Sequence, residues 1–515
     1  MGRDDDTDEK KLIASSGKDT PNEPKGSSRR SFLKTTAAGA IGAVVAGEYM
    51  GGTSNAEAQE FHSRLNNEKN RRILIKGGVV LSMDASVGDF ETGDVLIQGK
   101  KIAAVGQNLS SRGAQVIDAS NMIVLPGFCN SHNHMFQGNL RGYFSDALLL
   151  EYLTASRASP TAVFHQYTPE DVYLGALATS LCSLNEGVTT SVDTSQSSST
   201  PQHTDANIMG LRDGGVRAVF AYSATSGGNV VAPTYAYPQD LLRIQKQYFS
   251  SKDQLMTLAL GTSLNINNVQ LAHSADVPIV THFQNPTTEP LITAIKSAGL
   301  LTENISYVHC LNLTDSTWSM IRDSGGKVSL TIWTDQTLGQ GYVALQKTID
   351  YGLLPSFSTD ADSFGPSDMF TQMRAAFALQ RSRIAEAAAQ GGTNLPKYLN
   401  TRDILRMATL GGAQAAHVGD KVGSLTPGKE ADIVLLRTNL FNAAPLHSAT
   451  GTVVNFADAS NVDTVFVAGR VVKWRGNLVG WDLDKILKRL VASGKGLIQR
   501  AGYPHVLLGS CCTNH

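Results

Sequence analysis

Alternating hydrophobic and polar residues begin at Arg72 and continue to Gly127. The segments RILIKGGVVLSMD (72–84), GDVLIQGKKIAAVG (93–106) and AQVIDASNMIVLPG (114–127) combine branched apolar residues with glycine, asparagine and aspartate at their turns. Alternation with a period of two, bounded by such turn residues, is typical of β-strands that bury one face. This part of the chain therefore predicts a small β-domain.

A different pattern fills residues 128–419, where short apolar runs alternate with longer helical stretches. The apolar runs cover residues 187–193, 215–223, 255–261, 277–283, 305–310, 326–332 and 353–360. With the run that ends at His132, there are eight of them. Strands that alternate with helices predict parallel βαβ units, so this region is expected to form a (β/α)8 barrel of the TIM type, an α/β fold.

The β-type pattern returns after the barrel region. GSLTPGKEADIVLL (423–436) and VDTVFVAGRVVKWRG (462–476) again alternate apolar and polar residues. We therefore expect residues 72–127 and 420–480 to form one composite β-sandwich domain into which the barrel, residues 128–419, is inserted. Residues 481–515 are expected to form a C-terminal helix and tail.

Composition narrows the class of protein. The chain has 515 residues, of which 42% are hydrophobic and 17% charged, a balance that can build a large globular core. The net charge of −1 gives no reason to expect binding to nucleic acid or to an anionic membrane surface. Five scattered cysteines without a CxxC pair indicate neither a disulfide framework nor a thiolate zinc site.

Residues 1–58 have the character of a leader rather than of a folded domain. A charged, polar tail precedes SRRSFLK (28–34), which closely resembles the twin-arginine export consensus, and a weakly apolar stretch from Ala37 to Gly47 follows. That stretch is too short to span a bilayer, so no stable membrane anchor is expected. AEA (56–58) is a candidate cleavage site. The leader predicts export of the folded protein by the twin-arginine machinery to the periplasm, or its secretion.

Polar residues close several of the apolar runs in the barrel region. His132 and His134 end the first predicted strand, His282 the fifth, His309 the sixth and Asp360 the eighth. Carboxyl ends of barrel strands meet on one rim, where active sites of this fold lie. Imidazole and carboxylate suit Zn²⁺ or Fe²⁺, and such a metal would lower the pKa of a water molecule and create a nucleophile.

This set of residues resembles the amidohydrolase superfamily. PGFCNSHNH (126–134) is similar to its first-strand signature, GSLTPGKEADIVLL (423–436) to its return to the β-sandwich, and FSTDADSFGPSDMFTQMRAA (357–376) to the branch of cytosine deaminase, guanine deaminase and the s-triazine hydrolases. The resemblance implies metal ligation by His132, His134, His282 and Asp360, with catalytic roles for Asp360 and His309. It also implies a single metal ion, because the fourth strand ends without the lysine that two-metal members carry. Zinc is favoured over iron as that ion. A homo-oligomer, a dimer or larger, is implied as well.

The segment after His282 departs from the family pattern. Deaminases of this family carry a glutamate three residues after this histidine, where this chain has Asn285. An amide cannot act as a general acid or base, so proton transfer is expected to fall to Asp360, with His309 as a second candidate. Asn285, Gln284, Gln340 and His203 are candidate substrate contacts. We interpret Asp335 as a polar loop residue, and Asp193 as a helix cap or loop residue that could also line the pocket.

These features predict a metal-dependent hydrolase that acts on a non-peptide carbon–nitrogen bond of a small molecule by means of a metal-activated water. Its substrate would be an amide, a cyclic amide or an amino-substituted heterocycle. An s-triazine-like or nucleobase-like aminohydrolase or dehalogenase is the alternative, and a non-catalytic binding protein of the same fold is a second. No glycine-rich nucleotide-binding motif supports a dinucleotide-dependent or phosphate-binding enzyme.

Overall fold

The computed structural model describes residues 71–225, 237–284, 288–504 and 507. The predicted leader, residues 1–58, and the candidate substrate contact Asn285 lie outside the described residues. Among the residues that the structure describes, no helix combines the length and apolar character needed to cross a membrane.

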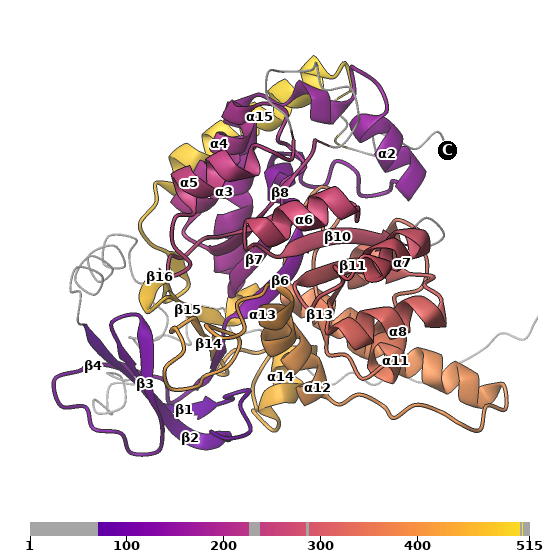
Figure 1. The fold of residues 1–515 in the computed structure, drawn as a ribbon. Coiled ribbons are helices and arrows are strands. Elements are labelled where there is room, and N and C mark those ends of the chain that lie inside the picture. The colour runs from indigo at the N-terminus through magenta and orange to yellow at the C-terminus, as the bar shows by residue number, and fades with distance from the viewer. Residues whose placement is uncertain (1–70, 226–236, 285–287, 505–506, 508–515) are drawn as a thin grey trace, which may run out of the picture. The chain divides into compact units, whose positions relative to one another are not determined.

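Eight parallel strands form the centre of the molecule (Figure 1). They are β6 (Phe128–Asn133), β7 (Val188–Thr194), β8 (Arg217–Ser223), β9 (Thr257–Gly261), β10 (Ile279–Gln284), β11 (Ile305–Leu311), β12 (Lys327–Leu330) and β13 (Pro355–Phe357). Every residue of β6, β7, β8 and β11 is buried, which explains why these strands appear in the sequence as continuous apolar or small-residue runs. The predicted α/β barrel is confirmed.

The two ends of this sheet meet at the barrel rim. Asn133, the last residue of β6, forms a parallel bridge with Asp360, which follows β13. The amide of His134 donates to the carbonyl of Asp360 over 2.6 Å, and the amide of Asp360 donates to the carbonyl of His132 over 3.2 Å. The seam that closes the barrel therefore lies at His132, His134 and Asp360, three of the five polar residues that end the predicted barrel strands.

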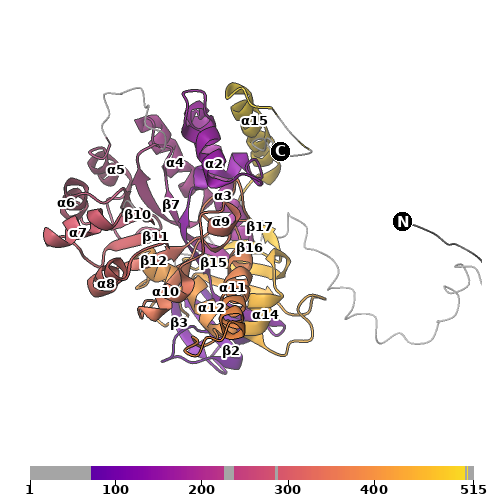
Figure 2. The same ribbon diagram turned by 90° about the vertical axis from the view of Figure 1, so that its right-hand side faces the viewer.

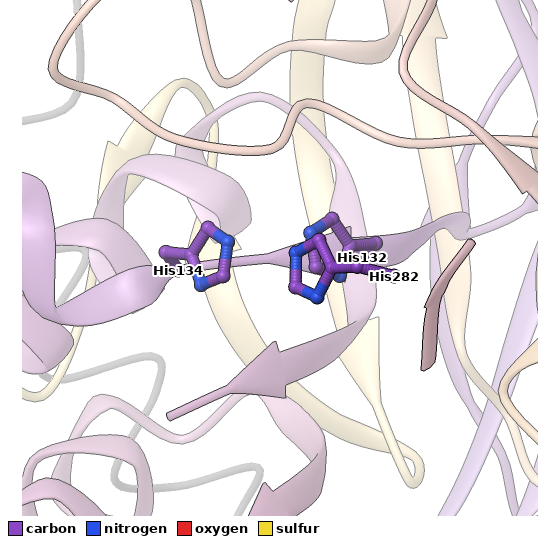
Figure 3. Close-up of side chains that lie close together, drawn as sticks. All are labelled: His132, His134 and His282. Carbon is purple, nitrogen blue, oxygen red and sulfur yellow. The ribbon is translucent and has the colours of Figure 1, made fainter. Parts of the chain in front are cut away.

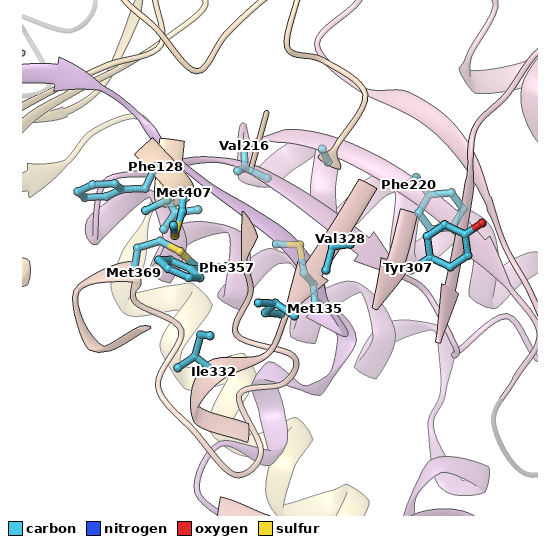
Figure 4. Packing of buried hydrophobic residues seen from close by; sticks show 14 of the residues in the cluster. Phe128, Met135, Val216, Phe220, Tyr307, Val328, Ile332, Phe357, Met369 and Met407 are labelled. Atoms are coloured by element: carbon cyan, nitrogen blue, oxygen red, sulfur yellow. The ribbon is translucent and has the colours of Figure 1, made fainter. Parts of the chain in front are cut away.

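Helices connect the strands on the outside of the barrel, and Figure 2 shows α4 to α8 following one another around it. Besides α2 (Leu149–Arg157), the α-helices that lie between successive strands or directly after the last are α3 (Pro169–Asn185), α4 (Pro201–Gly214), α5 (Leu241–Tyr248), α6 (Ile266–Ser274), α7 (Glu289–Ser297), α8 (Asp315–Ser324), α9 (Ile332–Thr337), α10 (Leu345–Asp350) and α11 (Met369–Ala389). Thr168, Thr200 and Thr314 cap the first turns of α3, α4 and α8 with their side-chain oxygens. Apolar residues of strands and helices share one core, part of which Figure 4 shows.

The seventh predicted strand ends earlier than its apolar pattern indicates. We expected residues 326–332, but β12 stops at Leu330 and α9 begins at Ile332. The amide of Asp335 donates to the carbonyl of Thr331, which starts a helical turn instead of a longer strand. This turn brings Asp335 to the rim of the barrel.

A second sheet contains strands from both sides of the barrel region. Its nine strands are β1 (Arg72–Val80), β2 (Phe90–Gln98), β3 (Lys101–Gly106), β4 (Gln115–Asp118), β5 (Met122–Pro126), β14 (Ile433–Arg437), β15 (Val462–Val467), β16 (Arg470–Trp474) and β17 (Asn477–Leu478). Strand β5 pairs with β1 on one side and with β14 on the other. Ile75 and Val95 share an apolar cluster with Ile433 and Phe466, so both parts of the chain contribute to one sheet with a shared apolar cluster.

Several further helices complete the described chain. They are α2 (Leu149–Arg157), α12 (Thr401–Arg406), α13 (Gly412–Ala415), α14 (Ala449–Asn455) and α15 (Leu483–Arg500). The C-terminal helix α15 is fixed to α3 and to the segment after β6, because Ser493 Oγ donates to Asp171 Oδ1 and accepts from Asn139 Nδ2. Helix α2 lies between β6 and α3 in the sequence and contributes to the pocket described next.

Candidate metal centre

Three imidazole rings lie together at the carboxyl ends of β6 and β10 (Figure 3). The ring centroids are 4.8 Å apart for His132 and His134, 4.8 Å for His132 and His282, and 5.3 Å for His134 and His282. His132 and His134 are buried and His282 is partly buried. Residues 132 and 282 are 150 positions apart in the chain, so the barrel brings them together.

Asp360 completes this group of donors. Its Oδ1 lies 3.2 Å from His132 Nε2 and 3.4 Å from His134 Nε2. Two overlapping sets each keep their nearest ligand atoms within 4.8 Å of one another: His132 with His134 and His282, and His132 with His309 and Asp360. Nitrogen and carboxylate donors at this spacing fit a zinc or iron ion.

A single threonine at the end of β7 orients two of the histidines. Thr194 Oγ1 lies 3.0 Å from His132 Nδ1, and the carbonyl of Thr194 lies 2.8 Å from His134 Nδ1. Since a carbonyl only accepts, the Nδ1 of His134 carries the proton and its Nε2 is left as the donor to a metal. Partners of this kind fix the tautomer and ring orientation of metal-binding histidines.

His309 has different partners. Its Nδ1 lies 2.7 Å from Thr331 Oγ1 and 2.8 Å from Asp335 Oδ1. The backbone of His309 has φ 67°, and the pairing of β10 with β11 shifts by one residue at this point. A bulge and a left-handed residue at a barrel rim re-aim a side chain, and here they turn His309 toward the same site.

Asp335 is not the polar loop residue that we expected. It is fully buried on α9, and its carboxylate holds His309. Asp193 is likewise buried, where it accepts hydrogen bonds from the Met135 amide and from Asn207 Nδ2. Burial raises the pKa of Asp193 to about 7. Asp193 therefore fixes the chain after His134 and does not line the pocket.

Burial and neighbouring charges shift the pKa values of the site residues in different directions. Burial lowers the pKa of His134 to about 3 and holds the pKa values of His132 and His282 below the usual range, which keeps them neutral as metal ligands must be. Burial alone would raise the pKa of Asp360, but the hydrogen bond with His132 and the neighbouring imidazoles lower it. Burial alone would lower the pKa of His309, but Asp335 raises it.

A pocket of about 390 Å³ opens onto these residues, a volume suited to a small organic molecule. His134, His282, His309 and Asp360 form its floor; the other described residues along it are Leu149, Tyr152, Leu153, Arg157, Gln196, Ser263, Gln284, Thr288, Leu338 and Gln340. Gln284 Nε2 donates to Gln340 Oε1 over 3.0 Å, so two of the candidate substrate contacts lie in the pocket and touch each other.

The structure does not bring His203 to this pocket. His203 lies in the first turn of α4, where Nδ1 is 2.7 Å from Thr200 Oγ1 and Nε2 is 3.0 Å from the carbonyl of Tyr167. Both ring nitrogens are engaged in holding the start of the helix. Tyr152, Arg157 and Gln196 also line the pocket, although no sequence pattern marks them as site residues.

A barrel whose rim gathers three histidines and an aspartate beside a small-molecule pocket has the arrangement of a metal-dependent hydrolase. Residues 123–472 match the Amidohydrolase family, and the chain belongs to that family. It is a hydrolase that acts on non-peptide carbon–nitrogen bonds.

Individual relatives agree with this assignment. The chain is 25% identical over 448 residues to 5-methylthioadenosine/S-adenosylhomocysteine deaminase 1 of Syntrophus aciditrophicus, covering 81% of this chain and 95% of that protein. It is 24% identical over 455 residues to 5'-deoxyadenosine deaminase of Methanosarcina acetivorans, covering 83% and 99%. The crystal structure of a triazine hydrolase variant has a TM-score of 0.72 at 25% identity and covers 82% of this chain and 99% of its own.

Proposed function

We propose that this protein holds one divalent metal ion, zinc in preference to iron, and hydrolyses the bond between a ring carbon and an exocyclic nitrogen of an aminated heterocycle. The observation that carries the proposal is the convergence of His132, His134, His282 and Asp360, of which His134, His282 and Asp360 line the pocket. Strand β9 ends in Leu260 and Gly261, without a lysine or an acid that could bridge a second ion. The names of the relatives, adenosine-type deaminases and a triazine hydrolase, have a nitrogen heterocycle in common.

A metal ion bound by these four residues supplies Lewis-acid activation of a water molecule. Asp360 accepts a proton from the attacking water and returns it to the departing nitrogen, because it is the one carboxylate among the described residues of the pocket. His309, fixed through Nδ1 by Asp335, directs its Nε2 edge toward the pocket and polarises the attacked ring. Gln284, Gln340 and Asn285 offer amides that bind the substrate without exchanging protons.

Removal and return of the metal test this proposal directly. The purified protein is expected to contain about one zinc or iron ion per chain, and chelation is expected to lower ammonia release from aminated pyrimidines, purines and triazines at least about 100-fold. Zinc should restore activity, whereas Mg²⁺ should not, since it prefers oxygen ligands. A stable protein that is metal-free when purified, or full activity after chelation, would contradict the proposal.

Asp335→Asn is expected to lower kcat about 10- to 100-fold while KM changes less, because the neutral amide no longer supports the charge and orientation of His309. The measurement is steady-state kinetics on whichever heterocycle the reconstituted enzyme hydrolyses. Asp350→Asn makes the same chemical change on the exposed surface of α10 and serves as the control. An unchanged kcat for Asp335→Asn would show that His309 needs no carboxylate partner.

A further inference from the structure

Arg157, the last residue of α2, is a fixed cation in the wall of the pocket. Its guanidinium carbon lies 5.2 Å from the centre of the Tyr152 ring and 5.4 Å from that of Phe164, and its Nη2 donates to Tyr152 Oη over 3.2 Å. The carbonyl of Arg157 accepts from His165 Nε2 over 3.3 Å. The bond from His165 fixes the backbone at this position. The two aromatic rings, the bond to Tyr152 and a bond of 3.3 Å from Nε to Ser156 Oγ hold the side chain in one orientation, as a recognition group requires.

The charges along the pocket favour an anion. Apart from the histidines, Asp360 and Arg157 are the charged residues among the described ones that line it. Asp360 belongs to the proposed metal site, where a divalent ion more than offsets its charge. A pocket with an excess of positive charge and partly apolar walls concentrates anionic ligands.

The remaining walls combine apolar side chains with an amide oxygen that is unpartnered within the described part of the chain. Leu149, Leu153 and Leu338 provide apolar surface. Gln196 Oε1 is buried and has no hydrogen-bond partner among the described residues, so it is available to accept from a ring N–H or amino group. The pocket therefore offers contacts for a heterocycle and, separately, a guanidinium for a substituent on it.

We propose that the natural substrate is an aminated heterocycle that carries a carboxylate, and that Arg157 binds this carboxylate and so determines specificity. The inference rests on the proposed function, since it concerns the same pocket. The planar fork of an arginine matches the two oxygens of a carboxylate, and such pairs are stronger than hydrogen bonds between neutral groups. A neutral ring stacked against Arg157 is the competing arrangement, and it predicts no preference for the anion.

Matched ligand pairs test the inference without depending on turnover. The zinc-reconstituted enzyme is titrated calorimetrically with aminopyrimidine- and aminotriazine-carboxylates and with the corresponding carboxamides. At least one carboxylate is expected to bind about 100-fold more tightly than its carboxamide, and Arg157→Met should abolish that difference. Arg157→Lys should retain part of it, because the charge remains but the fork is lost.

Arg381→Met is the matched control, because Arg381 also stacks on two rings, those of Phe377 and Tyr398, away from the pocket. Circular dichroism verifies that each variant is folded. The inference is overturned if no carboxylate binds more tightly than its carboxamide, or if Arg157→Met keeps the preference. Ammonia release distinguishes the two proposals. Carboxylates that bind through Arg157 but are not hydrolysed with any metal ion contradict the proposed function. Equal hydrolysis of the carboxylate and the carboxamide of each pair contradicts only the role of Arg157.

Discussion

Asp360→Asn is expected to reduce kcat by about 10²- to 10⁴-fold while the protein remains folded. Asp360 is the residue in which the two proposed roles meet, since its Oδ1 lies within 3.4 Å of both His132 and His134 and its carboxylate faces the pocket. The amide keeps the size of the side chain but loses the charge and the capacity to accept a proton. Steady-state kinetics and metal analysis of the same preparation measure both consequences.

Asparagine is the appropriate replacement because residue 360 has a left-handed backbone conformation. Asp360 has φ 64°, a left-handed conformation that asparagine tolerates nearly as well as aspartate, whereas alanine would add strain at the barrel seam. The control is Asp323→Asn, the same change at an exposed residue of α8. Loss of turnover with full metal content would assign Asp360 to proton transfer, and loss of both would assign it to ligation first. Near-normal turnover would contradict the mechanism.

The barrel was predictable because its strands obey a simple physical rule. A strand covered by helices on one face and by the barrel interior on the other must be apolar or small throughout, and residues of β7, β8 and β11 are buried without exception. A polar residue that closes such a run then lies at the rim. His132, His282 and Asp360 were found by that reasoning, and the structure places both His282 and Asp360 next to His132.

The residues that surround these metal-site side chains could not be predicted from the strand pattern. Asp335 stands in a polar segment that looks like any loop, and only the helical turn after β12 shows that it points inward. Thr194 acts partly through its carbonyl, which every residue possesses. Arg157 belongs to a connection between β6 and α3, and connections of this length have no periodicity that fixes their path. His203 failed as a prediction of a pocket residue because both its nitrogens bond locally.

Arg217→Met is expected to lower the free energy of unfolding by about 3–5 kcal/mol. Arg217 begins β8 at the base of the barrel, and its side chain is 2% exposed. Its Nε and Nη2 each lie 2.9 Å from an oxygen of Asp432, and Nη2 lies 2.6 Å from Glu430 Oε2. Asp432 and Glu430 precede β14 of the second sheet, so this ion network connects the barrel to that sheet.

Arg217→Met is expected to lower the free energy of unfolding because it leaves a buried carboxylate without its cation. Methionine can fill the space of the arginine stem, but among the described residues the buried carboxylate of Asp432 would then keep only the amide of Ala468, 2.7 Å away, as a hydrogen-bond donor. An uncompensated charge in the interior is far more costly than the loss of an exposed ion pair. Urea unfolding followed by circular dichroism measures the difference.

Arg212→Met provides the matched comparison, because Arg212 pairs with Asp213 at the surface, with side chains 54% and 41% exposed. Its effect should stay within about 1 kcal/mol. Adding Asp432→Asn to Arg217→Met should recover part of the lost stability, because it removes the charge that arginine no longer neutralises. If Arg217→Met instead unfolds at the same urea concentration as the unmodified protein, water or a rearranged Lys100 satisfies the carboxylates, and the network does not stabilise the contact between the barrel and the second sheet. Lys100 is placed to do so, since its Nζ lies 3.1 Å from Glu430 Oε1.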